Sequence, residues 1–185
     1  MRSEMDRDFL FAIASDEDRE GPVSKADIVA GIRSDDTELA GVIYDIVTTD
    51  KLRKRIEPPV VDEELENLLM PYFERCILTD PKGEWTLTRY SAAWEAQGCM
   101  LNLWDSEGGS SKSFARWQKW MEKLYRAGDE GIKRALVDGI LEHLFEEKGV
   151  RQFFADWKTD PELKIAYDEA QLWADTQPKN AQPAG

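Results

Sequence analysis

Histidine and cysteine are scarce in this chain of 185 residues. It contains one histidine, His143, and two cysteines, Cys76 and Cys99. Any Ser-His, Cys-His or multi-histidine metal arrangement must therefore use His143 or do without it. Each cysteine falls within an apolar helical pattern and belongs to no spaced framework, so we expect free thiols rather than a disulfide.

Positive charge is also in deficit. The chain has 24 lysines and arginines against 37 aspartates and glutamates, a formal net charge of −13. Such a balance repels nucleic acid and anionic membranes and favours basic partners. The one basic cluster, at 51–55, is expected to complement the dipole at a helix C-terminus. We therefore predict a basic protein as partner, with no direct binding of nucleic acid and no membrane.

Two short helices expected near 24–32 and 37–47 have the spacing of a helix-turn-helix motif. The second helix, however, offers Glu38 and Asp45 and no cationic or amide donor before Lys51. Contacts to phosphates and bases need such donors, so the residues argue against a DNA-reading helix.

Long apolar runs and phosphate-binding loops are missing as well. No 18-residue apolar segment and no signal-like N-terminal run occurs, which leads us to expect a cytoplasmic location. No Walker spacing, no GxGxxG after a strand and no GxSxG is found, so we expect no cofactor and assign no catalytic residue. An enzyme that works through two carboxylates stays possible, since glycosidases need no more than that. With 37 acidic residues, however, the sequence singles out no pair.

Apolar residues at helical spacing are abundant. The broadest stripe lies within 131–145 and consists of Ile132, Leu136, Val137, Ile140, Leu141, Leu144 and Phe145. Segments 113–125, 150–157 and 162–173 have large apolar residues at similar spacing and are expected to pack around it. We predict an all-α (mainly α) fold, a multi-helix orthogonal bundle with at most a short strand near 85–89.

Prolines and polar segments suggest the domain boundaries. The pair Pro58 and Pro59 should end a helical subdomain at 1–57, followed by a tryptophan-rich helical core at 58–175 and a disordered tail at 176–185. Pro71 should kink or split a helix that begins at Asp62. The stretch 108–113 is expected to be a flexible loop.

Aromatic residues concentrate towards the C-terminus, since all seven tryptophans lie between Trp85 and Trp173. One helical face is expected to hold Tyr90, Ala93, Trp94, Gln97, Leu101 and Trp104. Trp117 and Trp120 cannot share one narrow stripe with their apolar neighbours. At least one aromatic there should be partly exposed, although core packing is favoured over an interface.

Acidic residues in the expected loops are the candidate contacts for a basic partner. They gather there rather than on repeated helix faces, and a solvated turn is the alternative for the loop at 16–20. The candidates are Asp16, Glu17, Asp18, Asp35, Asp36, Asp105 and Glu107.

Carboxylates also surround the single histidine. Glu142 and Glu146 flank His143, and Glu147 follows it at a spacing of four on one helix face. The residues admit an enzyme or metal protein centred there. The carboxylate di-metal pattern Glu-x-x-His would require a glutamate where Ile140 stands, so a surface histidine on an acidic helix is favoured and no metal is assigned.

The last 50 or so residues resemble small helical immunity-type proteins of bacterial polymorphic toxin systems. In those proteins an apolar helix ending in Leu-Glu-x-Leu is followed by a short linker and a terminal amphipathic helix closing with tryptophan. The corresponding residues here are Ile140, Leu141, Glu142, Leu144, Phe153, Leu163 and Trp173. The resemblance implies a binding protein that occludes a toxin and has no catalytic residues. An acidic mimic of nucleic acid that inhibits a DNA-binding enzyme is the alternative with the same charge logic.

Overall fold

A computed structural model describes residues 5–107 and 111–177, which are mainly helical, as expected. The chain forms two compact units, Met1–Ala92 and Ala93–Gly185. They divide within α6 (Arg89–Ser106) rather than at Pro58 and Pro59, where the sequence had suggested the boundary. Residues 178–185 of the tail expected at 176–185, and residues 108–110 of the flexible loop expected at 108–113, lie outside the described residues. Thr176, Lys112 and Ser113 are helical, so both expected segments are slightly too long.

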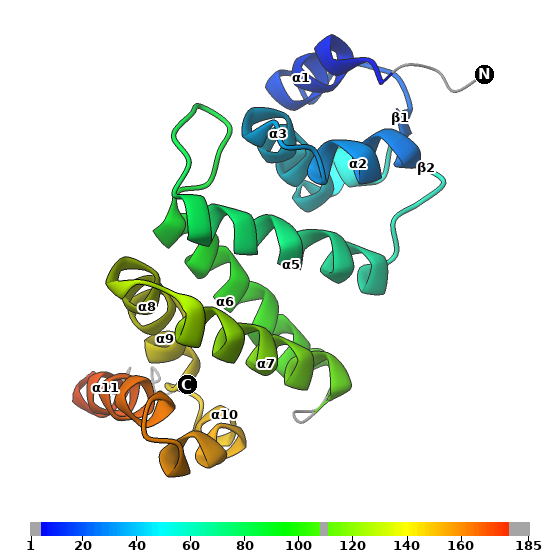
Figure 1. Cartoon of the computed structure of the whole chain (residues 1–185). Coiled ribbons are helices and arrows are strands. Elements are labelled where there is room, and N and C mark those ends of the chain that lie inside the picture. The colour runs from blue at the N-terminus through cyan, green and yellow to red at the C-terminus, as the bar shows by residue number, and fades with distance from the viewer. Residues whose placement is uncertain (1–4, 108–110, 178–185) are drawn as a thin grey trace. The chain divides into compact units, whose positions relative to one another are not determined.

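The first unit is built from helices and one small parallel strand pair (Figure 1). Val23 pairs with Ile56 across the two strands, so segments more than thirty residues apart are joined. In chain order the elements are α1 (Arg7–Ser15), β1 (Val23–Ser24), α2 (Lys25–Ile32), α3 (Thr37–Thr48), α4 (Asp50–Arg53), β2 (Ile56–Glu57) and α5 (Asp62–Thr79).

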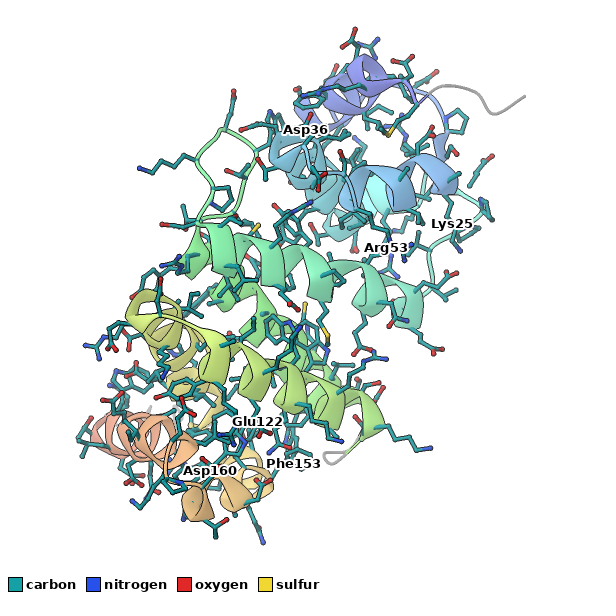
Figure 2. The ribbon with its side chains drawn as sticks, in the orientation of Figure 1. Lys25, Asp36, Arg53, Glu122, Phe153 and Asp160 are labelled. Atoms are coloured by element: carbon teal, nitrogen blue, oxygen red, sulfur yellow. The ribbon has the colours of Figure 1, made fainter. Side chains whose placement is uncertain are left out.

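Helix α5 is fastened to the elements that precede the two prolines. Lys25 donates hydrogen bonds to the Glu64 carboxylate at 2.6 and 2.7 Å. Arg75 donates to the carbonyl oxygens of Ile32 and Ser34, at the α2–α3 turn. Figure 2 labels Lys25 as well as Arg53, whose guanidinium lies 2.6 Å from a carboxylate oxygen of Asp62. The prolines therefore lie in a connection inside the first unit and not at its edge.

Helix α3 is the centre of this unit. Its residues Leu39 to Ile43, together with Ile46 and Val47, are buried, and it packs against α1, α2 and α5. Tyr44 stacks on Tyr72 of α5 with ring centroids 5.4 Å apart. The helix that a helix-turn-helix reading would place in a DNA groove is thus largely enclosed by protein.

The segment before α6 forms a loop, and the short strand that the sequence allowed at most near 85–89 does not form. Side chains take up its backbone donors: the N–H of Trp85 donates to Glu38 at 3.2 Å, and that of Leu87 donates to the Tyr72 hydroxyl at 3.4 Å. A Cβ added at Gly41 would lie 1.8 Å from the carbonyl oxygen of Trp85, so glycine permits this loop to lie against α3. Trp85 and Leu87 would point their N–H groups to the same edge of a strand, and both donors are already bonded to side chains.

Helix α5 runs unbroken through Pro71, so of the two expected outcomes, a kink or a split, the split does not occur. It begins at Asp62, and the Glu64 carboxylate accepts the N–H of Val61 at 3.1 Å. Cys76 is buried in this helix, and it and Cys99 are both free thiols, as expected.

The second unit wraps around the stripe that the sequence singled out. After the remainder of α6 come α7 (Lys112–Ala127), α8 (Glu130–Leu136), the π-helical turn η1 (Val137–Leu141), α9 (Glu142–Leu144), α10 (Lys148–Phe153), the 3₁₀ turn η2 (Ala155–Thr159) and α11 (Leu163–Thr176). All seven residues of the expected stripe are buried. The one feature not expected from the pattern is the π turn in its middle.

An aromatic core and a surface ion-pair network hold this unit together. Phe114 lies 5.1 Å from Phe153, ring centre to ring centre. Arg126 of α7 bonds Glu122 at 3.0 Å and Asp160 at 2.6 Å; Figure 2 labels both acidic residues. Asp160 also accepts the N–H of Leu163 at 3.0 Å, as expected for the start of the last helix.

Two expectations about aromatic faces are wrong. Trp117 and Trp120 are both buried, because the buried face of α7 is broad enough to include both indoles. On α6 the buried face consists of small residues such as Ala93 and Ala96, while Trp94 is 53% exposed. The close packing of α6 on its neighbours leaves no room for an indole on that face.

Candidate functional site

The acidic loop between α1 and β1 faces the basic cluster. Asp18 forms an ion pair with Lys51, and the hydrogen bond from Lys51 lowers the pKa of Asp18. Arg55 donates two hydrogen bonds to the carbonyl oxygen of Gly21, at 2.8 and 3.1 Å. Loop and cluster together line an open pocket. The two strongest charge features of the sequence therefore partly neutralise each other.

In the described part of the chain, two further acids of this loop, Asp16 and Glu17, have no ion pair of their own, although Glu17 lines the same pocket and, after the Asp18 hydrogen bond, helps to raise the pKa of Lys51. Asp16 and Glu17 are exposed, and Asp45 of α3 is half-buried. Burial raises the pKa of Asp45, and the nearby Glu17 carboxylate raises it further. Among the described residues, Asp45 has no ion-pair partner. We call Asp16, Glu17 and Asp45 the acidic corner of the first unit.

Sequence reasoning did not include Asp45 among the candidate contacts. The sequence pattern marks it only as an acidic residue on a helix that lacks DNA-binding donors. The sequence did carry an indication, because Asp45 lies between Tyr44 and the buried Ile46 on a helix rich in apolar residues. A carboxylate in such a position loses part of its hydration. The proximity of Glu17 could not be known before α1 was placed against α3.

Asp36 has a structural role. Its carboxylate accepts the N–H of Leu39 at 3.1 Å and so caps α3, and it forms an ion pair with Arg7 of α1. The neighbouring Asp35 is exposed. Of this candidate pair, only Asp35 is left with its carboxylate open to solvent.

The remaining candidates lie in the second unit. Asp105 belongs to α6 and is not in a loop, and Glu107 follows the end of that helix. Both are exposed. The structure thus brings Asp16, Glu17 and Asp18 together, places Asp35 and Asp36 at the start of α3, and leaves Asp105 and Glu107 in a separate unit.

Charge is divided unequally between the units. Residues 1–92 contain 21 acidic and 12 basic residues, a formal net charge of −9, whereas residues 93–185 contain 16 and 12, a net charge of −4. The excess of negative charge therefore belongs mainly to the unit that contains the acidic corner.

The histidine region differs from its expected form. Helix α9 ends at Leu144 and Glu147 precedes α10, so His143 and Glu147 do not share a helix face. The His143 ring lies between the indoles of Trp94 and Trp173, with centroids 4.7 Å from each. Its Nδ1 is 3.4 Å from a carboxylate oxygen of Glu146.

Burial and the nearby Asp138 carboxylate raise the pKa of Glu142 to about 6. Glu169 of α11 raises it slightly further, while Arg134 opposes the shift. Within 5–107 and 111–177, no group of three or more His, Cys, Asp or Glu residues is placed to hold a metal ion.

None of the helices in the described part of the chain combines the length and the apolar character needed to cross a membrane. No family model, curated protein or solved structure matches the chain. Function has therefore to be inferred from the geometry and charge of the described residues.

Proposed function

We propose that this is an acidic binding protein of the cytoplasm that blocks a basic protein partner and does no chemistry of its own. The immunity-type resemblance of its C-terminal residues points the same way. The observation that carries the proposal is the acidic corner: Asp16, Glu17 and Asp45, in the unit with a net charge of −9.

A basic partner would relieve a cost that the free protein bears. Asp45 is partly buried and faces a like charge on Glu17, which disfavours its ionised form. A lysine or arginine side chain placed between the two carboxylates would favour both ionised forms and offset the repulsion between them. The wider field of the unit would also speed the encounter, because opposite charges steer association at low salt.

The first experiment is capture of partners from a lysate of the native host on the immobilised protein, at low and at high salt. We expect one basic protein that is retained at low salt and lost as salt rises, since a Debye length of about 8 Å at physiological salt screens exposed charges. If nothing basic is retained at low salt, the proposal fails.

Two matched double variants then locate the contact. Asp16→Asn with Glu17→Gln removes two negative charges from the acidic corner, and Asp105→Asn with Glu107→Gln removes two from the second unit. We expect the first pair to slow association with the captured partner roughly two- to tenfold at low salt, and the second pair to change it little. Equal effects would mean that total charge, not the acidic corner, governs association.

Competition with DNA distinguishes the proposed role from the alternative, in which the chain mimics nucleic acid and inhibits a DNA-binding enzyme. If the captured protein binds DNA, and an added duplex displaces it from the immobilised chain, the partner's DNA-binding surface is the one that is blocked. If duplex DNA has no effect, the chain blocks a different surface.

A further inference from the structure

Trp94 is the exposed end of a cluster of three rings in the second unit. Its indole packs edge-to-face against His143 of α9, which packs in the same way against Trp173 of α11. One side of Trp94 is supported by this stack, while the residue stays 53% exposed. The core of the unit does not need it, because Ala93, Ala96 and Met100 fill the buried face of α6. A rigid, half-exposed indole of this kind is typical of a binding anchor.

Gly98 lies one helical turn beyond Trp94 on the same side of α6. A Cβ added at Gly98 would meet no atom within 4 Å. Glycine inside a helix costs about 1 kcal/mol relative to alanine, and no packing within the described part of the chain requires it here. The glycine leaves a flat place beside the indole where the backbone of another chain can approach.

The charge around this cluster is negative. Glu95 follows Trp94 on α6 and is exposed, and Glu146 contacts His143. Glu142, next to His143, has a raised pKa. Arg134 is the basic residue that opposes this shift, and its guanidinium also lies 3.4 Å from a carboxylate oxygen of Asp138. A cation that arrives here meets an aromatic face together with carboxylates.

We propose that Trp94, Gly98, His143 and Trp173 form a surface, the Trp94 surface, that binds an arginine side chain carried by a segment of a basic protein. The planar guanidinium stacks on the free face of the Trp94 indole, as arginine does in cation–π contacts. The nearby carboxylates favour its charge, and the backbone of the segment passes over Gly98. A second copy of this chain would instead bring like charges together, so self-association is disfavoured.

This surface is separate from the acidic corner, which lies in the other unit. It goes beyond the proposed function by assigning a second contact and the kind of side chain that the contact takes.

Nuclear magnetic resonance on the full chain tests the proposal, because His143 is the only histidine and its imidazole C–H signals are therefore unique. The probes are alanine-based helical peptides of about 16 residues with arginine, lysine or glutamate at every fourth position. We expect the arginine peptide to shift the His143 signals and the Trp94 indole N–H signal saturably. It should bind about two- to fivefold more tightly than the lysine peptide.

Variants show whether Trp94 makes the contact. Trp94→Ala is expected to abolish the saturable shift of the His143 signals by the arginine peptide, and Trp94→Tyr is expected to restore most of it. Ile165→Ala, which removes another exposed apolar side chain of the same unit, is expected to leave it unchanged. The proposal is overturned if Trp94→Ala binds the arginine peptide as tightly as the unaltered protein, or if the glutamate peptide binds as tightly as the arginine peptide.

Gly98→Ala provides a test with two opposite readouts. It should raise Tm by about 2–4 °C, since alanine favours the helix and meets no atom, and should weaken binding of the arginine peptide. A raised Tm together with unchanged affinity for the arginine peptide would show that the segment does not pass over Gly98. The variant with Asp16→Asn and Glu17→Gln is expected to keep the His143 shifts, so failure at one surface can be told from failure at the other.

Discussion

At the scale of single residues, a carboxylate's role depends on what its fold places beside it. Asp18 and Asp36 belong to the same set of loop acids as Asp16 and Asp35, yet Asp18 pairs with Lys51 and Asp36 both caps α3 and pairs with Arg7. Acids used in this way are poor candidates for a partner, because a partner would have to displace the existing cation. Asp16, Glu17, Asp35 and the half-buried Asp45 are better ones.

Glu142 allows a prediction about pH at this scale. Its pKa is about 6 in the folded chain and 4.5 without the fold, so the folded state holds the proton more firmly between these values. Stability is therefore lost as pH rises from about 4.5 to 6, and the loss persists above that range. Glu142→Gln should be more stable than the unaltered protein at pH 7.5 by about 1 kcal/mol, after allowance for the exposed part of the side chain.

Urea unfolding at pH 7.5 and at pH 4 measures this effect. The advantage of Glu142→Gln should shrink towards pH 4, where the native carboxyl is protonated. Glu20→Gln, which removes an exposed acid of the first unit, serves as the control and should show little change at either pH. An advantage of the same size at both values of pH would contradict the assignment to ionisation of Glu142.

At the scale of elements, backbone approach decides how helices meet. The π turn at Val137–Leu141 brings Gly139 so near α6 that a Cβ there would lie 2.8 Å from the Cβ of Ala93. The periodic stripe correctly predicted which residues are buried, since apolar burial follows the side-chain pattern. It did not predict the π turn, because an extra residue in the turn depends on the packing of α6 against it.

Gly41 gives a prediction that contrasts with Gly98. Gly41→Ala would put a methyl group against the carbonyl oxygen of Trp85, so the loop at 80–88 must move or α3 must shift. Overpacking of this kind should destabilise the protein by roughly 1–3 kcal/mol. Thermal unfolding of the two glycine variants should give opposite signs, with a lower Tm for Gly41→Ala and a higher one for Gly98→Ala. A Tm for Gly41→Ala at or above that of the unaltered protein would show that the loop is not held against α3.

At the scale of the whole molecule, the net charge of −13 sets how the chain responds to salt. Repulsion among like charges opposes the compact state, and salt screens it. Raising NaCl from about 10 to about 200 mM should therefore raise Tm by about 2–4 °C, equivalent to roughly 1 kcal/mol.

Scanning calorimetry checks this expectation. The variant with Asp105→Asn and Glu107→Gln, which has two fewer negative charges, should gain less from salt. A Tm that falls as salt is added would mean that screened ion pairs, such as that of Arg126 with Asp160, contribute more than the net repulsion costs.

The amino-acid sequence by itself determined the helical class, the buried stripe at 132–145, the free thiols and the acidic balance, because these follow from local periodicity and composition. Only the tertiary structure decided where charges meet and which aromatics stay outside. The Lys51–Asp18 pair, the Glu17–Asp45 proximity and the exposure of Trp94 each depend on elements distant in sequence. The sequence pattern describes one element at a time, whereas the pairing of a charge and the burial of an indole depend on how elements pack together.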